Sequence, residues 1–264
     1  MAITTLDGYI ASAKQTLQWT KTGTRTTVAL NYSSVFDIAG SPGAGTLAGT
    51  STTNGVVPTD ADAGHPIINA FGVGNTGYLS RFSAAGTVAG RITLFDRLFV
   101  CGAYAFNANT ALTSQPSYAG RLPNTNYNGL EIWVEQVTAA TGNQAVTVTY
   151  TNQAGVGSRS TGAVGVGAAP IVGRCWQLPL QAGDSGVQKI DNVQGTVATA
   201  GTFNVMVLRR LVSVRIPVVG ASVSMNLLDT GLREIYDTSA LYVLLSPDAT
   251  AIGVPDLDIE ICNG

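Results

Sequence analysis

The feature that most constrains the fold of this chain is a succession of short segments in which β-branched and aromatic residues recur with a period of two. Clusters of Gly, Asn, Ser and Pro, which favour turns, separate these segments. Because no helices alternate with them, the sequence predicts an all-β fold, an antiparallel β-sandwich or jelly roll with long Gly/Ser/Thr-rich loops. Nine segments are predicted as strands: 77–84, 90–100, 130–138, 145–152, 173–180, 186–193, 202–214, 240–246 and 257–262.

Two of these segments show which side chains share a face. In 145–152, Val146, Val148 and Tyr150 lie opposite three threonines. This alternation predicts a half-buried strand whose threonine face meets water or a neighbouring molecule. In 130–138 the two faces carry Leu130, Ile132 and Val134 on one side and Glu131, Trp133 and Glu135 on the other.

The segment 205–214 is apolar on both faces apart from its arginines. Such a composition is expected of a central strand, or of one that an adjacent subunit buries. Arg209, Arg210 and Arg215 form the densest basic spot of the chain, and we expect them on the solvent or interface face of the strand. The other basic residues are dispersed and the net charge is −2, so the sequence predicts no nucleic-acid partner.

The N-terminus carries the one helical pattern. Ile10, Ala13 and Leu17 recur at intervals of three and four residues within 6–19, and Thr5 can serve as the N-cap. We predict a short amphipathic helix that either folds back on its own domain or docks on a neighbour as an arm.

Two further segments complete the predicted organisation. The segment 39–62 is almost entirely Gly, Ser, Thr, Ala and Pro and reads as an extended loop. No linker forces a second domain, so the predicted division is a helix or arm at 1–25 and a single β-sandwich domain at 26–264.

Charge is scarce in this chain. Only 11% of its residues are charged, whereas a typical soluble domain carries about a quarter. A surface so poor in charge is easily desolvated, which suits a subunit that spends its life against neighbours. The N-terminus does not read as a signal peptide and no apolar stretch approaches about 18 residues, so we expect a soluble protein without a membrane partner.

No cofactor or metal site is predicted. The three cysteines are odd in number, far apart and without metal-ligand spacing, so each is expected as a small buried residue, although Cys262 could pair with another subunit. Calcium ligands are conceivable but match no EF-hand pattern. The carboxylates in question are Asp60 and Asp62, and separately Asp256, Asp258 and Glu260.

The sharpest candidate for catalysis is the sequence GDSG at 183–186. It resembles the nucleophile element of chymotrypsin-like serine proteases, and His65, Asp96 and Ser185 stand in that family's order. The usual GDSGGP continuation is absent because Val187 follows, and the surroundings of His65 do not match either. We therefore expect a tight turn between two strands, and no enzyme.

Two weaker patterns are also interpreted as structural. Glu131 and Glu135 lie four residues apart on one strand, roughly 13 Å at about 3.3 Å per residue, which exceeds either glycosidase spacing. They are expected on a solvated strand face. The Gly-rich motifs lack the Lys-Ser/Thr end of a phosphate-binding loop and are interpreted as turns.

Several longer blocks resemble an uncharacterised family of virion structural proteins of tailed double-stranded DNA phages. The blocks span nearly the whole chain and read MAITTLDGYIASA, YLSRFSAAGTVAGRITLFDRL, VTVTYTNQAG, LPLQAGDSGVQ and GLREIYDTSALYVLLSP. This family carries no catalytic signature that could be transferred to the chain.

The resemblance implies a place in the virion, made in the host bacterial cytoplasm. The first expectation is a capsid decoration, or cement, protein that binds the assembled shell and buries seams between capsid subunits, and the alternative is a tail, fibre-base or other minor component. The expected partners are the major capsid protein and neighbouring copies of the chain, with a trimer favoured. The predicted contact residues are Ile10, Leu17, Trp19, Trp133 and Tyr242.

Overall fold

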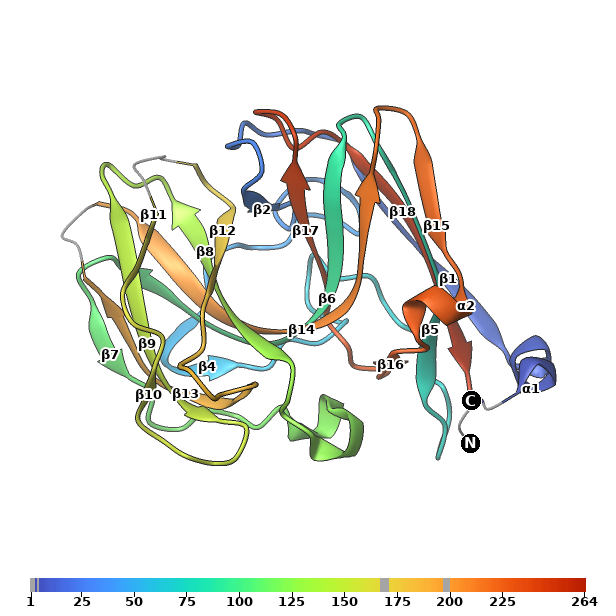
Figure 1. Cartoon of the computed structure of the whole chain (residues 1–264), viewed down its shortest axis with the longest axis horizontal. Helices are drawn as coiled ribbons and strands as arrows, with labels where there is room; N and C mark the ends of the chain where they lie inside the picture. Colours follow the sequence, from blue (N-terminus) through green and yellow to red (C-terminus); the bar gives the residue numbers. More distant parts are fainter. Residues whose placement is uncertain (1–2, 4, 167–170, 197–199) are drawn as a thin grey trace.

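The computed structural model describes residues 3, 5–166, 171–196 and 200–264. Three antiparallel sheets make up most of this part of the chain (Figure 1). Sheet A contains β1 (Lys14–Lys21), β3 (Gly40–Ser41), β5 (Gly77–Gly86), β15 (Ser222–Met225), β16 (Glu234–Ile235) and β18 (Pro255–Asn263). Sheet B contains β7 (Asn109–Ala111), β9 (Gln144–Asn152), β10 (Arg159–Ser160), β11 (Val164–Val166) and β13 (Val187–Gly195).

The third, central sheet contains β2 (Tyr32–Ser34), β4 (Ser51–Val56), β6 (Gly90–Ala105), β8 (Leu130–Thr138), β12 (Arg174–Leu178), β14 (Thr202–Ile216) and β17 (Leu241–Pro247). Six of these strands pair in the order β14-β8-β12-β2-β17-β6, and β6 pairs with β14 again. The central sheet therefore closes into a ring. The helices are short: α1 (Leu6–Ala11), α2 (Leu227–Thr230) and the 3-10 turns η1 (Ala119–Arg121) and η2 (Pro123–Thr125).

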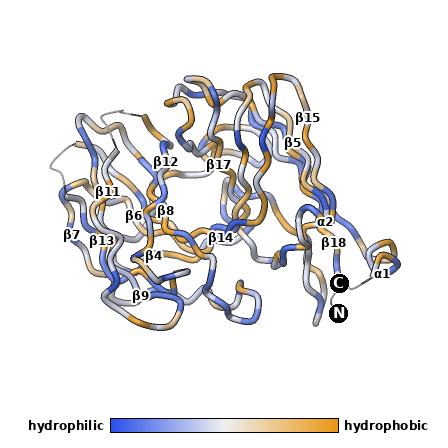
Figure 2. The backbone as a smooth tube through the Cα atoms, viewed as in Figure 1, coloured by the Kyte–Doolittle hydropathy of each residue, from blue (hydrophilic) through white to orange (hydrophobic). Residues whose placement is uncertain are grey.

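Two lobes lie on either side of this ring. In the left lobe of Figure 1, sheet B packs on β8 and β12 around a core that includes Val148, Tyr150 and Ile132. In the right lobe, sheet A packs on β6 and β17 around a core that includes Trp19 and Phe82. Figure 2 shows hydrophobic stretches in the strands of both lobes. The all-β sandwich expected from the sequence is confirmed, as two sandwiches built on one shared sheet.

The two long strands β6 and β14 run through both lobes. In β14, Phe203 to Val207 contribute to the left core and Leu211 to Ile216 to the right core. The pairing of β14 with β6 shifts register between Val207 and Leu208 and again between Arg210 and Val212. Such bulges bend a strand and increase its twist, which lets one strand serve two sandwiches. The prediction of a central strand at 205–214 is confirmed.

A third apolar cluster belongs to the ring itself. Its largest members are Phe36, Phe95, Trp133 and Tyr242. Trp133 contacts the ring of Phe95 edge-on at a centroid distance of 5.7 Å. Trp133 therefore lies on the opposite face of β8 from Leu130, Ile132 and Val134, as the alternation along the strand predicts. Both faces of β8 are nevertheless buried, because one face packs in the left lobe and the other faces the ring cluster.

The N-terminal prediction needs correction. Helix α1 ends at Ala11, and the Thr5 hydroxyl caps it by accepting from the backbone N–H of Gly8 at 3.0 Å. The following residues form β1, which pairs with β18 from Lys14 to Thr20. The segment 14–21 of the predicted arm is therefore an integral strand of sheet A. Residues 1–2 and 4 of that arm, which was predicted at 1–25, lie outside the described part.

The segment 39–62 is less irregular than predicted. It contributes β3 to sheet A and β4 to the central sheet, and Leu47 between them is buried in the ring cluster. All nine strands predicted from the sequence are present, at β5, β6, β8, β9, β12, β13, β14, β17 and β18.

Candidate functional site

The outer face of sheet B carries a block of uncharged side chains over three adjacent strands. Thr149 pairs with Asn192 and Asn192 with Ala111, while Thr147 pairs with Gln194 and Gln194 with Asn109. All six side chains point away from the core and are half-buried or exposed. We call Asn109, Ala111, Thr147, Thr149, Asn192 and Gln194 the neutral face.

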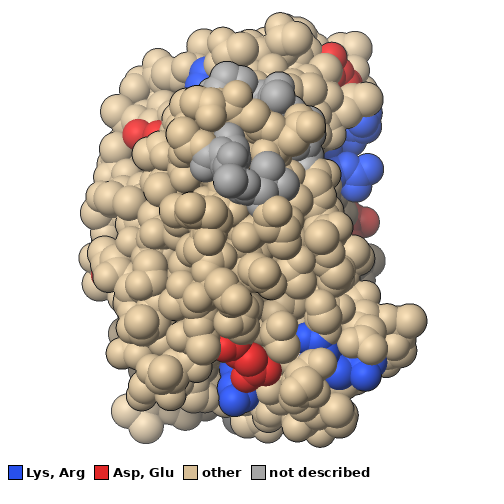
Figure 3. All heavy atoms as spheres, turned by 90° about the vertical axis from the view of Figure 1, so that its left-hand side faces the viewer, with Lys and Arg blue, Asp and Glu red and all other residues tan. Residues whose placement is uncertain are grey.

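The rest of this side of the molecule is similarly poor in charge. Figure 3 views the lobe from the side of sheet B, and its broad surface is almost free of charged side chains. Lys189 and Asp191 on β13 neutralise each other at 3.0 Å. Neutral polar groups lose less hydration energy on burial than charges do, so this face suits contact with another protein.

The surface is poor in charge partly because several charged side chains are buried. Of the 14 basic and 16 acidic residues, eight in total are buried: Lys21, Asp60, Asp96, Arg97, Arg121, Glu135, Arg174 and Arg209. Fewer charged side chains therefore reach the surface than the composition alone would supply.

A second surface feature is an apolar hollow of about 550 Å³ between α1 and α2. Leucines of both helices line it, and Leu228 is 83% exposed. Ile10 on the same helix as Leu6 is 64% exposed. Both helices therefore present accessible large apolar side chains.

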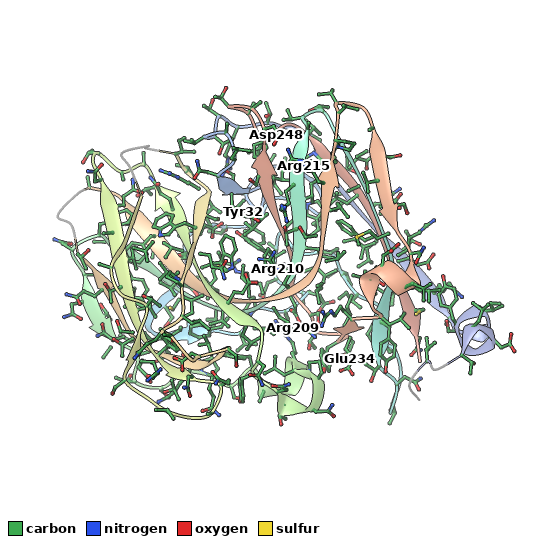
Figure 4. The ribbon with its side chains drawn as sticks, viewed as in Figure 1. Tyr32, Arg209, Arg210, Arg215, Glu234 and Asp248 are labelled. Carbon is green, nitrogen blue, oxygen red and sulfur yellow. The ribbon has the colours of Figure 1, made fainter. Side chains whose placement is uncertain are left out.

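A polar cleft of about 550 Å³ lies where the lobes meet, lined by β8, β14 and the segment around α2. Arg210 donates to both carboxylate oxygens of Glu131, at 2.9 and 3.2 Å, and Trp133 Nε1 donates to the same carboxylate at 2.7 Å. Figure 4 shows Arg209 and Arg210 in this region, and Arg215 beside Asp248 farther along the strand. Arg210 forms an ion pair with Glu131, and Arg215 forms one with Asp248.

Behind the cleft, Asp96 is the centre of a buried charge network. Its carboxylate accepts from Arg121 at 2.9 Å, from Arg209 at 3.2 Å and from the Ser239 hydroxyl at 3.0 Å. Arg209 also donates to the backbone oxygen of Glu234 at 2.8 Å. The prediction that Arg209 lies on a solvent or interface face is wrong, because Asp96 holds it inside; Arg210 is half-buried and Arg215 exposed.

Glu131 and Glu135 have different environments despite their shared strand. Glu131 is half-buried beside Arg210, whereas Glu135 is fully buried and accepts from the hydroxyl of Tyr242 and from Asn204 Nδ2. The prediction of a solvated face is therefore wrong for Glu135. Neither residue is opposed to the other across a cleft, and each carboxylate is held by its own donors.

The residues in the order of a serine protease triad are engaged elsewhere. His65 Nδ1 hydrogen bonds to the backbone oxygen of Leu241 at 2.7 Å, and Asp96 is surrounded by its arginines. Ser185 Oγ donates to Asn128. The contacts that the structure describes therefore do not join these three side chains in a relay.

The GDSG sequence forms the turn that the sequence analysis expects. The Asp184 N–H donates to Gln181 O at 3.0 Å, and β13 begins at Val187. The Asp184 carboxylate accepts from Arg159, Tyr150 and Asn152. The Arg159 hydrogen bond is the main cause that lowers the pKa of Asp184 to about 2. This aspartate fixes a loop.

The other sequence candidates can be placed briefly. Cys101, Cys175 and Cys262 are all buried with free thiols, and burial raises the pKa of each, so Cys262 presents no accessible thiol. Within the described residues no three His, Cys, Asp or Glu side chains are grouped as a metal site would require. None of the described helices is long and apolar enough to cross a membrane.

Three of the five predicted contact residues are not on the surface as expected. Trp19, Trp133 and Tyr242 are at most 1% exposed. They belong to the right-lobe core and the ring cluster, so the prediction that they anchor a partner is wrong. Leu17 is half-buried against the right-lobe core, and Ile10 alone is largely exposed. The neutral face was recognisable in part, since the threonines of 145–152 were expected to meet water or a neighbour.

No family model matches the sequence, and no curated protein matches it. Among solved structures, the alignment with the infectious bursal disease virus Gt strain covers 96% of this chain and 80% of that chain, at 10% identity and a TM-score of 0.18. The alignment with the VP2 subviral particle of the same virus covers 96% and 80%, at 9% identity and a TM-score of 0.18. A TM-score this low carries no argument about fold or function.

Proposed function

We propose that the chain is a structural protein of a tailed-phage virion, and specifically a decoration protein that binds the assembled capsid and stabilises it. The observation that carries the proposal is the neutral face of sheet B on a molecule that buries eight of its charged side chains. The sequence blocks that resemble a family of phage virion proteins support a location in the virion.

The mechanism is burial of a seam between capsid subunits. The neutral face spans three paired strands, and its uncharged threonine, asparagine and glutamine side chains can exchange hydrogen bonds with water for hydrogen bonds with a partner. Because such a protein binds only the assembled shell, it shifts the equilibrium toward that shell by mass action. Many copies, each with a modest affinity, would stabilise the particle.

The neutral face is tested by placing charge on it. We expect Thr149→Lys and Gln194→Lys each to weaken binding to shells assembled without this protein by about tenfold or more, because the ammonium must be desolvated at the contact. Both side chains point away from the core, so the free energy of unfolding should change little. Binding is measured by co-sedimentation at several protein concentrations.

The matched control is Ser224→Lys on the outer face of sheet A, where Ser224 is exposed and its hydroxyl hydrogen bonds to that of Ser83 on the same face. It should bind shells as the wild type does. Wild-type binding by both sheet B variants would contradict the role of the neutral face, and loss of binding by all three would indicate a general effect of charge.

A further inference from the structure

A separate cavity of about 370 Å³ lies between the loop 46–50, the segment 56–65 and strand β6. Phe36, Leu47 and Val100 form its apolar lining. Two buried polar side chains, His65 and Arg97, also line it. The cavity is not part of the neutral face, and the inference drawn from it does not depend on the proposed function.

The Arg97 guanidinium makes no hydrogen bond within the described part of the chain. Its side chain is 4% exposed, and the nearest carboxylate oxygen, on Glu135, is 3.9 Å from Nη2. The rings of Phe36 and Tyr242 lie about 5 Å away, with centroid distances of 5.0 and 5.1 Å. Aromatic rings attract the charge but supply no lone pairs for the five N–H donors of arginine, and buried polar groups are normally hydrogen-bonded.

His65 contributes a hydrogen-bond acceptor, whereas Arg97 contributes donors. A backbone oxygen can only accept, so the Nδ1 that contacts Leu241 O at 2.7 Å must carry the ring's proton. Burial lowers the pKa of His65 to about 4, which keeps the ring neutral near pH 7. The buried Nε2 therefore presents a lone pair, and no donor in the described structure reaches it.

The charges near the cavity are unevenly paired. Asp96 bonds Arg121 at 2.9 Å and Arg209 at 3.2 Å, whereas Arg97 lies 3.9 Å from the Glu135 carboxylate. The Arg97 charge is therefore the least closely compensated of the three, and a poorly paired ion in the interior is costly. Asp62 at the rim is exposed, and its carboxylate already accepts from the backbone N–H of Thr59 at 2.7 Å.

We propose that this cavity binds a small oxyanion that carries a hydroxyl group. The anion's oxygens accept from the Arg97 guanidinium and supply the close counter-charge that it lacks, while its hydroxyl donates to Nε2 of His65, which is otherwise unpaired within the described part of the chain. Water alone would occupy the donors but would bring no negative charge beside Arg97. Hydrogen phosphate and hydroxycarboxylates share this chemistry.

Isothermal titration calorimetry of the intact protein near pH 7 with four anions tests the proposal. Phosphate and glycolate carry a hydroxyl, whereas sulfate and acetate are oxyanions of the same shape class without one. In at least one pair, we expect saturable binding that is about tenfold tighter for the hydroxylated member, since leaving a buried acceptor without a donor costs about that much. The pair that binds identifies a phosphate or a carboxylate ligand. Absence of saturable binding by all four, or equal binding within both pairs, would overturn the proposal.

Two variants locate the site. Ala48→Phe places a ring at the exposed rim of the cavity and should abolish binding without lowering the melting temperature of the anion-free protein. Arg97→Lys keeps the charge but removes the planar fork, and should weaken binding by about tenfold or more. Arg215→Lys, at the exposed pair with Asp248, is the matched control and should bind as the wild type does. Wild-type affinity in Ala48→Phe would place the anion elsewhere and contradict the inference.

Discussion

Replacing Asp96 by alanine should lower the free energy of unfolding by about 3–5 kcal/mol. The Asp96 carboxylate is fully buried and accepts from two guanidinium groups and one hydroxyl. Its removal would leave Arg121 and Arg209 without their shared counterion, on strands and turns from both lobes. Urea denaturation followed by tryptophan fluorescence measures the change.

The control for this prediction is Asp248→Ala, which removes the exposed ion pair with Arg215. Exposed pairs are worth little, so the loss should stay below about 1 kcal/mol. If the two variants lost similar stability, or if Asp96→Ala remained within about 1 kcal/mol of the wild type, the network around Asp96 would not be the structural centre that its contacts indicate.

Trp19→Ala should also destabilise the protein strongly, by about 3–5 kcal/mol, because it would leave a large cavity in the right-lobe core. Ile10→Ala, on exposed helix α1, should change stability by less than about 0.5 kcal/mol. The measurement is the same denaturation experiment on both variants.

This pair of variants tests whether the N-terminal segment changes from a peripheral helix, α1, to a core strand, β1. A large loss of stability in Ile10→Ala would show that α1 is part of the folded core, and a negligible loss in Trp19→Ala would contradict the place of β1 in sheet A. Deletion of residues 1–12 is the corresponding test of whether the helix contacts a partner, since a longer deletion would remove β1 itself.

The strands could be predicted from the sequence because their alternation is a local property. Val146, Val148 and Tyr150 face the left-lobe core as their spacing requires. The N-terminal helix was predicted too long, since Leu17 satisfies a helical interval from Ala13 and equally alternates with Trp19 along a strand. Pairing with β18, more than two hundred residues away, decides between the two.

The buried charges could not be predicted from neighbouring residues. From their neighbours in sequence, Glu135 and Arg209 are expected to be exposed to solvent. Their burial is stabilised by partners that are distant in the sequence: Tyr242 donates to Glu135, and Arg209 donates to Asp96. The cavity is equally non-local, because Phe36, His65 and Arg97 come from three segments that are distant in the sequence and meet only in the folded chain. The neutral face could be predicted in part. Its threonines follow from the alternation in β9, but the residues from β7 and β13 join them only through the pairing of these strands.

The most direct test of the proposed function is the copy number of this protein in purified particles, by quantitative mass spectrometry against the major capsid protein. The proposal predicts a ratio comparable to that of the capsid protein, as expected of a subunit that covers repeated seams. A ratio far below it would indicate a tail or vertex component and contradict decoration of the shell. Absence from the particle would contradict a virion role altogether.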